Sequence, residues 1–147
     1  MVDIRVELEG SKFDLRACGI LEKEGEILVS IEADCTQTLS GGAVKIGEKT
    51  EETVVREFLE ETGLVVKVDS LVGVVENFFE WEHMPYQQVI FVYKVSLEVE
   101  TNDVLECREK VNAKWLPIIE VQDLKPVVLN RLITSEEEVI RHVINQD

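Results

Sequence analysis

Residues 42–64, which read GAVKIGEKTEETVVREFLEETGL, constrain the fold of this chain more than any other stretch. A glycine-rich loop at Gly41 and Gly42 leads into a segment with strong helix signals. Thr50 is the predicted N-cap, acids follow in the first turn, and Gly63 is suited to end the helix in a left-handed conformation. We therefore predict one helix that is fixed at both ends and preceded by a tight loop.

At about 100° of rotation per residue, this helix has one apolar side and one acidic side. The apolar stripe, which we expect to be buried, consists of Val54, Val55, Phe58 and Leu59. Glu57, Glu60 and Glu61 stand at i, i+3 and i+4 and gather on the opposite side. Their mutual repulsion disfavours the helix. Arg56 is expected to offset part of this repulsion by pairing with Glu60 or with Glu52, and a bound cation would offset the rest.

The spacing of the segment is more specific than an acidic helix face, which is usually only a solvated surface. The pattern G-x5-E-x7-R-E-U-x-E-E-x-G-U, with U apolar, is met at every position from Gly42 through Glu48 to Leu64. This segment resembles the Nudix box, the signature of the Nudix (MutT-like) pyrophosphohydrolases. The acidic helix and its upstream loop are therefore interpreted together as one site.

The resemblance implies an α/β fold, a Nudix-type α/β/α sandwich with a mixed β-sheet, in a single domain over residues 1–147. The residue pattern favours the same class, since strands surround one central helix. Strands are predicted at 15–21, 27–31, 64–75, 88–99 and 111–116. A turn is predicted at 24–25, a short helix from Pro117 and a C-terminal helix over 136–144. Residues 76–85 are predicted to form a loop or hairpin end with exposed aromatic side chains.

By the same resemblance, Glu57, Glu60 and Glu61 bind Mg²⁺ or Mn²⁺, and Glu57 and Glu60 are catalytic together with Arg56. Carboxylate oxygens suit such hard cations, which neutralise phosphates and acidify an attacking water. Arg56 would orient its acidic neighbours, and Glu48 would lie near the metal or tie the loop to the helix. Gly41, Gly42 and Gly63 would shape the loop and the end of the helix.

The general base stays open between a glutamate of the box and an acid of a distal loop, for which Glu106 and Glu109 are the candidates. Many members of the family read Leu-Pro-Gly-Gly where this chain has Leu39-Ser40-Gly41-Gly42. The missing proline removes no metal ligand but leaves the rigidity of the loop open. Thr53 replaces a frequent alanine and should fit.

The residues that contact the substrate are less defined by the sequence. Arg16 is a candidate phosphate contact, although an arginine at the start of a strand is more often a surface charge. Phe79 and Trp81, with Phe78 and Tyr86, are candidates to stack on a nucleobase. The alternative is that these rings cover an end of the sheet or form a dimer contact.

Charge and cysteine usage restrict the partners and the compartment. Thirty acidic and fifteen basic residues give a net charge of −15, which repels nucleic-acid backbones and anionic membrane surfaces. A diphosphate would be repelled as well, so a metal ion is needed to bring it in. Three cysteines without metal-site spacing, and the absence of a signal-peptide or membrane-span pattern, favour a cytoplasmic protein.

The expected function is divalent-metal-dependent hydrolysis of a diphosphate linkage in a nucleoside diphosphate derivative or a nucleoside triphosphate. The expected partner is therefore a small nucleotide-type substrate, and a homodimer is possible. The alternative is a non-catalytic module that senses a nucleotide or dinucleotide metabolite in the same pocket, and a third interpretation is a purely structural cation on the acidic helix.

Overall fold

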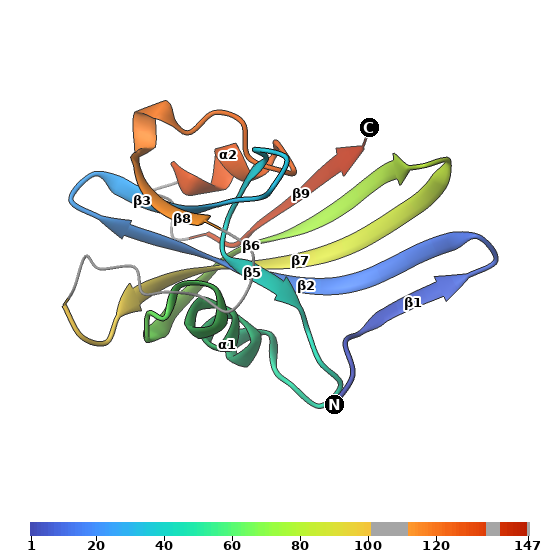
Figure 1. The fold of residues 1–147 in the computed structure, drawn as a ribbon, viewed down its shortest axis with the longest axis horizontal. Coiled ribbons are helices and arrows are strands. Elements are labelled where there is room, and N and C mark those ends of the chain that lie inside the picture. Colours follow the sequence, from blue (N-terminus) through green and yellow to red (C-terminus); the bar gives the residue numbers. More distant parts are fainter. Residues whose placement is uncertain (101–111, 135–138, 147) are drawn as a thin grey trace.

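The computed structural model describes residues 1–100, 112–134 and 139–146. Within these residues a mixed β-sheet has the long helix α1 (Thr50–Thr62) on one face and the short helix α2 (Leu129–Ile133) on the other (Figure 1). The strands are β1 (Arg5–Leu8), β2 (Ser11–Lys23), β3 (Glu26–Ile31), β4 (Gln37–Thr38), β5 (Gly41–Ala43), β6 (Val66–Trp81), β7 (Met84–Leu97), β8 (Asn112–Pro117) and β9 (Arg141–Gln146). The 3₁₀-helix η1 (Ile118–Glu120) follows β8. The predicted α/β fold with a mixed sheet is confirmed.

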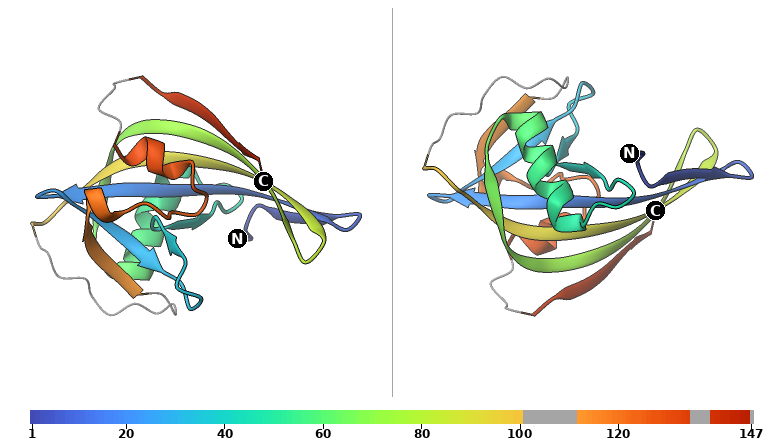
Figure 2. Two further views of the ribbon diagram at one scale, coloured as in Figure 1. Left: turned by 90° about the horizontal axis from the view of Figure 1, so that it is seen from above. Right: turned by 90° about the horizontal axis from the view of Figure 1, so that it is seen from below.

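The sheet has the strand order β4-β3-β2-β7-β6-β9, with β1 and β5 also paired to β2 and β8 paired to β3. The β2–β7 and β6–β9 pairs are parallel, and the other pairs are antiparallel. The two further views in Figure 2 show α1 and α2 on opposite sides of this sheet. Strand β2 is central because it pairs with four other strands along its length.

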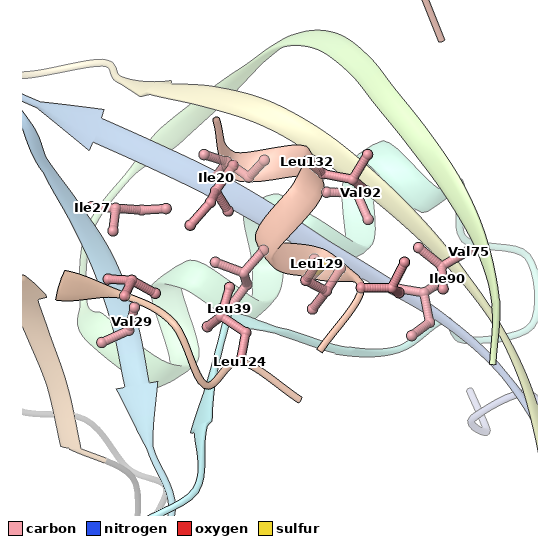
Figure 3. Close-up of a cluster of buried hydrophobic side chains, with 14 of the residues drawn as sticks. Ile20, Ile27, Val29, Leu39, Val75, Ile90, Val92, Leu124, Leu129 and Leu132 are labelled. Carbon is pink, nitrogen blue, oxygen red and sulfur yellow. The ribbon is translucent and has the colours of Figure 1, made fainter. Parts of the chain in front are cut away.

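Strand β2 is buried on both faces in its second half, and this explains its near-continuous apolar run. Ala17 and Leu21 pack with Phe58 of α1, whereas Cys18 and Ile20 pack on the other side of the sheet. Figure 3 shows the second cluster, in which Leu129 and Leu132 of α2 lie with side chains of the sheet. The core is therefore divided into two layers by the sheet.

Helix α1 ends at the predicted residue, but its N-cap lies one residue earlier than predicted. Gly63 has φ 75° and its N–H donates to Leu59 O at 3.0 Å. This left-handed conformation favours glycine, which has no Cβ atom to cause strain. The N-cap is Lys49 rather than Thr50, and the Lys49 N–H donates to the Glu52 carboxylate at 2.9 Å. Glu52 therefore caps the helix instead of pairing with Arg56.

The buried side of α1 differs from the apolar stripe expected from the sequence. Val54 and Phe58 are fully buried, but Leu59 is 54% exposed. Glu57 and Glu61 are buried instead, since their side of the helix packs against the β5 loop and β3. The acidic face of the helix is therefore largely an internal surface, not a solvated one.

The predicted C-terminal helix over 136–144 is wrong where the structure describes it, because Arg141–Gln146 forms strand β9. The apolar residues of this stretch have helix-like spacing, but the open edge of β6 supplies a full parallel ladder for the backbone. Val143 packs into the core, and His142 contacts Glu76 at 2.7 Å. Sheet pairing here outweighs the local pattern.

The predicted loop or hairpin end at residues 76–85 proves to be a hairpin with a very short turn. Strand β6 runs to Trp81 and β7 starts at Met84. Glu82 and His83, with φ of 51° and 64°, make the two-residue turn. The hairpin turn at residues 24–25, the strand at 112–117 and a short helix after Pro117 agree with the prediction.

The structure adds two observations to the prediction of the cellular compartment, one on membrane-spanning helices and one on cysteines. Among the residues that the structure describes, no helix has the length and apolarity needed to cross a membrane. Cys18 and Cys35 are free thiols, and burial raises the pKa of Cys18 to about 12. Cys107 lies outside the described residues, and the cytoplasmic location stays a prediction.

Candidate metal and catalytic site

The glycine-rich loop and helix α1 meet at Gly42 and Glu57. A Cβ atom on Gly42 would lie 2.5 Å from Glu57 Oε1, closer than Cβ atoms come to other atoms in proteins. A side chain at position 42 would therefore force the Glu57 carboxylate to shift. The Glu57 side chain is in turn held in a narrow space, and the residue is 8% exposed.

Arg56 joins the loop to the acidic side of α1 through five hydrogen bonds. Its Nε and Nη2 donate to the two carboxylate oxygens of Glu48, at 2.8 and 3.0 Å. Nη2 also donates to Ala43 O at 3.1 Å. Nη1 donates to Glu57 Oε1 at 2.9 Å and to Glu60 Oε2 at 3.2 Å. The expected Arg56–Glu60 pair is present, and Glu48 does tie the loop to the helix.

The Arg56–Glu48 pair shifts the titration of both groups. The bond from Arg56, supported by Thr53 Oγ1 at 2.6 Å and the Lys45 N–H at 3.1 Å, lowers the pKa of Glu48 to about 2 although burial opposes this. The same bond raises the pKa of Arg56 above its ordinary value. Thr53 fits as expected, and it contributes a hydrogen bond that alanine could not make. The pair is therefore ionised throughout the neutral range.

We expect the Glu48–Arg56 pair to make folding stability depend on pH below about 4.5. Since the pKa of Glu48 falls from 4.5 to about 2 on folding, the pair stabilises the folded state by about 3 kcal/mol at neutral pH. This contribution is lost as pH falls from about 4.5 to about 2. Glu48→Gln should therefore unfold at lower urea concentration than the parent at pH 7, and the difference should vanish near pH 2. Glu51→Gln, an exposed acid of the first turn, is the matched control and should show no such convergence.

Glu61 accepts a hydrogen bond from one serine, which in turn contacts a second serine. Ser30 on β3 donates to Glu61 Oε2 at 3.3 Å, and the Ser30 and Ser40 hydroxyls lie 3.0 Å apart. All three residues are buried. The Ser40 hydroxyl therefore links the start of the loop to β3. The rigidity of the loop, which the sequence leaves open, stays a prediction.

The three glutamates fit a divalent cation by donor type, although they do not form a ready-made cage. Within the described ranges, no three His, Cys, Asp or Glu side chains are grouped so as to hold a metal ion. However, Glu57 and Glu60 both turn one oxygen to the same nitrogen of Arg56. Two carboxylates that converge on one positive charge, with Glu61 one turn along the helix from Glu57, offer the hard oxygen donors that Mg²⁺ and Mn²⁺ take.

The candidate substrate-binding residues stand on strands β2 and β6, outside α1 and its loop. Arg16 is on β2, where it pairs with Ala43 of β5 and donates to the Asp14 carboxylate at 3.3 Å. Phe79 stacks on Tyr86 with a centroid distance of 4.8 Å, whereas Trp81 is exposed at the hairpin end. Glu106 and Glu109 lie outside the described residues. Their suggested roles stay predictions.

Sequence reasoning missed Ser30 as a member of the site. It lies 31 positions before Glu61, so only the packing of β3 against α1 brings the two side chains together. The one available signal was the serine itself, within the apolar run ILVSI. A buried hydroxyl in such a strand implies a hydrogen-bond partner.

Comparison with known proteins gives consistent matches over most of the chain. The model of the NUDIX domain matches residues 14–138. A MutT-like protein of Streptomyces ambofaciens is 41% identical over 130 residues, which are 87% of this chain and 79% of that protein. An ADP-ribose pyrophosphatase of Methanocaldococcus jannaschii is 49% identical over 61 residues, but these span only 38% of this chain and 36% of that protein.

Solved structures show the same fold. The MutT protein of Bacillus halodurans superposes with a TM-score of 0.69 and 19% sequence identity, covering 90% of each chain. At this identity the likeness concerns the arrangement of the sheet and helices. The family and the fold are thus indicated by independent comparisons.

Proposed function

This chain belongs to the NUDIX family of hydrolases, and from that membership we propose that it hydrolyses a diphosphate linkage with the help of a divalent cation. The substrate class is a nucleoside diphosphate derivative or a nucleoside triphosphate. The observation that carries the proposal is the convergence of Glu57 and Glu60 on Arg56, beside the loop at Gly42, where an added Cβ atom would displace the Glu57 carboxylate.

The residues of the site have distinct roles in this proposal. Glu57, Glu60 and Glu61 would hold Mg²⁺ or Mn²⁺, which when bound neutralises phosphate oxygens and lowers the pKa of a coordinated water. Arg56 orients Glu57 and Glu60, and Glu48 fixes the guanidinium from its other side. The base that takes the proton of the attacking water is proposed to be a glutamate of the box or one of Glu106 and Glu109.

One relative suggests where a search for substrates should begin. The archaeal protein is named an ADP-ribose pyrophosphatase, so ADP-ribose is a first candidate for this chain too. Because the matched region is little more than a third of that relative, the substrate is a proposal and not a transfer of identity. A homodimer and the exclusion of long nucleic acids likewise stay predictions.

The experiment that tests this function is a screen in the presence of Mg²⁺ or Mn²⁺, with products identified by mass. The screen covers ADP-ribose, nucleotide sugars, dinucleotides, coenzymes and nucleoside triphosphates. We expect at least one substrate to yield two phosphorylated products whose masses sum to substrate plus one water, and a chelator should abolish the reaction. Nucleotide binding detected by thermal shift, without product at saturating metal, would contradict hydrolysis and support the sensing module.

A further inference from the structure

Ser30 is a buried residue of strand β3 whose side chain reaches the acidic side of helix α1. It shares a side of β3 with Leu28, which packs in the cluster around Phe58, because every second residue of a strand points the same way. Val29, the residue between them, packs in the cluster on the opposite side of the sheet. The Ser30 hydroxyl is thus directed from the sheet toward α1, where it donates to Glu61 Oε2 at 3.3 Å.

The backbone that carries this hydroxyl is paired on both sides. Ser30 is the partner of Thr38 on β4 and of Ala113 on β8, in two antiparallel ladders. Its side chain is surrounded by protein, since the residue is 1% exposed. A donor on a paired and buried strand has little freedom to move, and it therefore provides a fixed point for the carboxylate that it contacts.

The second serine gives this set of hydrogen bonds one direction. A hydroxyl has a single proton, and Ser30 donates its proton to the Glu61 carboxylate, which accepts and does not donate. In the 3.0 Å contact between the two serine hydroxyls, Ser40 is therefore the donor. The backbone of Ser40 is fixed as well, since its carbonyl accepts from the Gly19 N–H at 3.0 Å. Hydrogen bonds that run from Ser40 through Ser30 to Glu61 thus link the loop, the sheet and the helix.

The contact from Ser30 determines how the Glu61 carboxylate is turned. The last torsion of a glutamate side chain has a broad energy profile, so a fixed donor selects one orientation of the carboxylate plane. For Glu57 and Glu60 this donor is Arg56, whose Nη1 contacts both. Ser30 has the same effect on Glu61, which is buried one turn along α1 from Glu57. The three carboxylates are thus oriented by groups from two different elements.

We propose that Ser30 is a positioning residue of the metal site, because its hydroxyl holds Glu61 in the orientation that binds the divalent cation. Ser40 keeps that hydroxyl turned to Glu61, and Ser30 acts through Glu61 and not on the substrate. The inference rests on the proposed function and deepens it, since it adds a strand residue outside the Nudix box to the groups that determine metal affinity. Hydrogen bonds to a metal ligand fix its geometry, so their loss weakens metal binding.

The test measures Mn²⁺ binding to the full chain by isothermal calorimetry without substrate, so that turnover plays no part. Ser30→Ala should weaken binding about tenfold or more, the usual effect of losing a group that orients a metal ligand. Ser30→Thr keeps the hydroxyl and should bind Mn²⁺ more tightly than Ser30→Ala. Ser40→Ala should cause a smaller loss, because Ser30 can still donate to Glu61.

A double-mutant cycle shows whether Ser30 acts through Glu61. Glu61→Gln removes one charged ligand, while Glu57 and Glu60 keep weaker Mn²⁺ binding measurable. In this background, Ser30→Ala should change the affinity much less than in the parent, because the carboxylate that it orients is no longer present. An equal effect of Ser30→Ala in both backgrounds would contradict the inference, since the serine would then act on the fold as a whole.

Two control variants separate positioning from stability. Val29→Ala removes buried volume from the same strand on the side away from α1, so it should lower the melting temperature but keep the parental Mn²⁺ affinity. Ser96→Ala removes another hydrogen bond from a serine to a carboxylate, that of Asp69, and should also keep the parental affinity. Parental affinity in Ser30→Ala would overturn the inference, and so would an equal loss of affinity in Ser30→Ala and Val29→Ala.

Thermal unfolding in a chelator establishes that each variant is folded at the temperature of the calorimetry. If Ser30→Ala is unfolded at that temperature, Ser40→Ala takes its place in the binding measurement and in the cycle with Glu61→Gln. Parental Mn²⁺ affinity in a folded Ser40→Ala protein would then overturn the inference, because the direction of the Ser30 hydroxyl would not affect the metal site.

Turnover separates a failure of this inference from a failure of the proposed function. If a diphosphate substrate is hydrolysed, Ser30→Ala should raise the Mn²⁺ concentration at half-maximal rate by the same factor as the dissociation constant. Hydrolysis with an unchanged Mn²⁺ requirement would contradict the role of Ser30 alone. Mn²⁺ binding that depends on Ser30 and Glu61, without hydrolysis of any diphosphate, would contradict the proposed function alone. A parent chain that binds no Mn²⁺ would contradict both.

Discussion

Glu60→Gln is expected to lower kcat/KM for the hydrolysed substrate by more than about 100-fold while the melting temperature changes little. Glu60 turns one oxygen to the Arg56 nitrogen that also binds Glu57, and its side chain is 41% exposed. The loss of a partner outside the metal's own ligands already costs about 10–100-fold, so the loss of a ligand should exceed this. The exposed Arg56–Glu60 contact itself contributes little to stability. Steady-state kinetics at saturating Mg²⁺, together with thermal unfolding, measure the two effects.

The matched control for this variant is Glu51→Gln, which removes an exposed charge from the same helix outside the box. It should retain parental kinetics. A Glu60→Gln protein that turns over a confirmed substrate as fast as the parent would show that this carboxylate is neither ligand nor catalyst. In that case the metal would have to be held by Glu57 and Glu61 with groups from elsewhere.

Arg56→Ala is expected to lower the free energy of unfolding by about 2–3 kcal/mol, below the range for fully buried ion pairs because this pair is only partly buried. Glu48 would be left partly buried without its cation, and the Ala43 carbonyl would lose a donor. Glu57 and Glu60 would lose the nitrogen toward which both now turn. Urea unfolding at pH 7 measures the stability, and activity should fall together with it because the carboxylates lose their common orientation.

Arg56→Lys separates charge from geometry in the same site. Lysine keeps the positive charge but cannot donate to both oxygens of Glu48 in a fixed fork. We expect a stability between those of the parent and of Arg56→Ala, with activity closer to the alanine variant. A loss below 1 kcal/mol in Arg56→Ala, measured beside Arg131→Ala as an exposed control, would show that the pair does not hold the loop to the helix.

The helix and its loop could be predicted because their signals are local. The glycine at the end of α1, its acids at fixed spacing and the upstream glutamate all act within one stretch of about 20 residues. The prediction of a helix over 136–144 was wrong, because residues 141–146 pair with the edge of β6 although the apolar residues of this stretch have a spacing that suits a helix. Edge pairing depends on the whole sheet, which no local pattern contains.

The candidate site was predictable only in part, for the same reason. The family resemblance implied that Glu48 lies near the metal or ties the loop to the helix, but not that it contacts Arg56. The contact of Ser30 with Glu61 joins segments that are far apart in the sequence.

The buried serine at position 40 stabilises the loop against local unfolding in a different way from a proline at this position. Proline would restrict the backbone even in the unfolded chain, whereas a hydroxyl has its partner only after β3 and α1 have assembled around it. Order in Gly41 and Gly42 is therefore tied to docking of the helix. Protection of these amides against exchange with solvent deuterium should follow that of α1, so that loop and helix open as one cooperative unit.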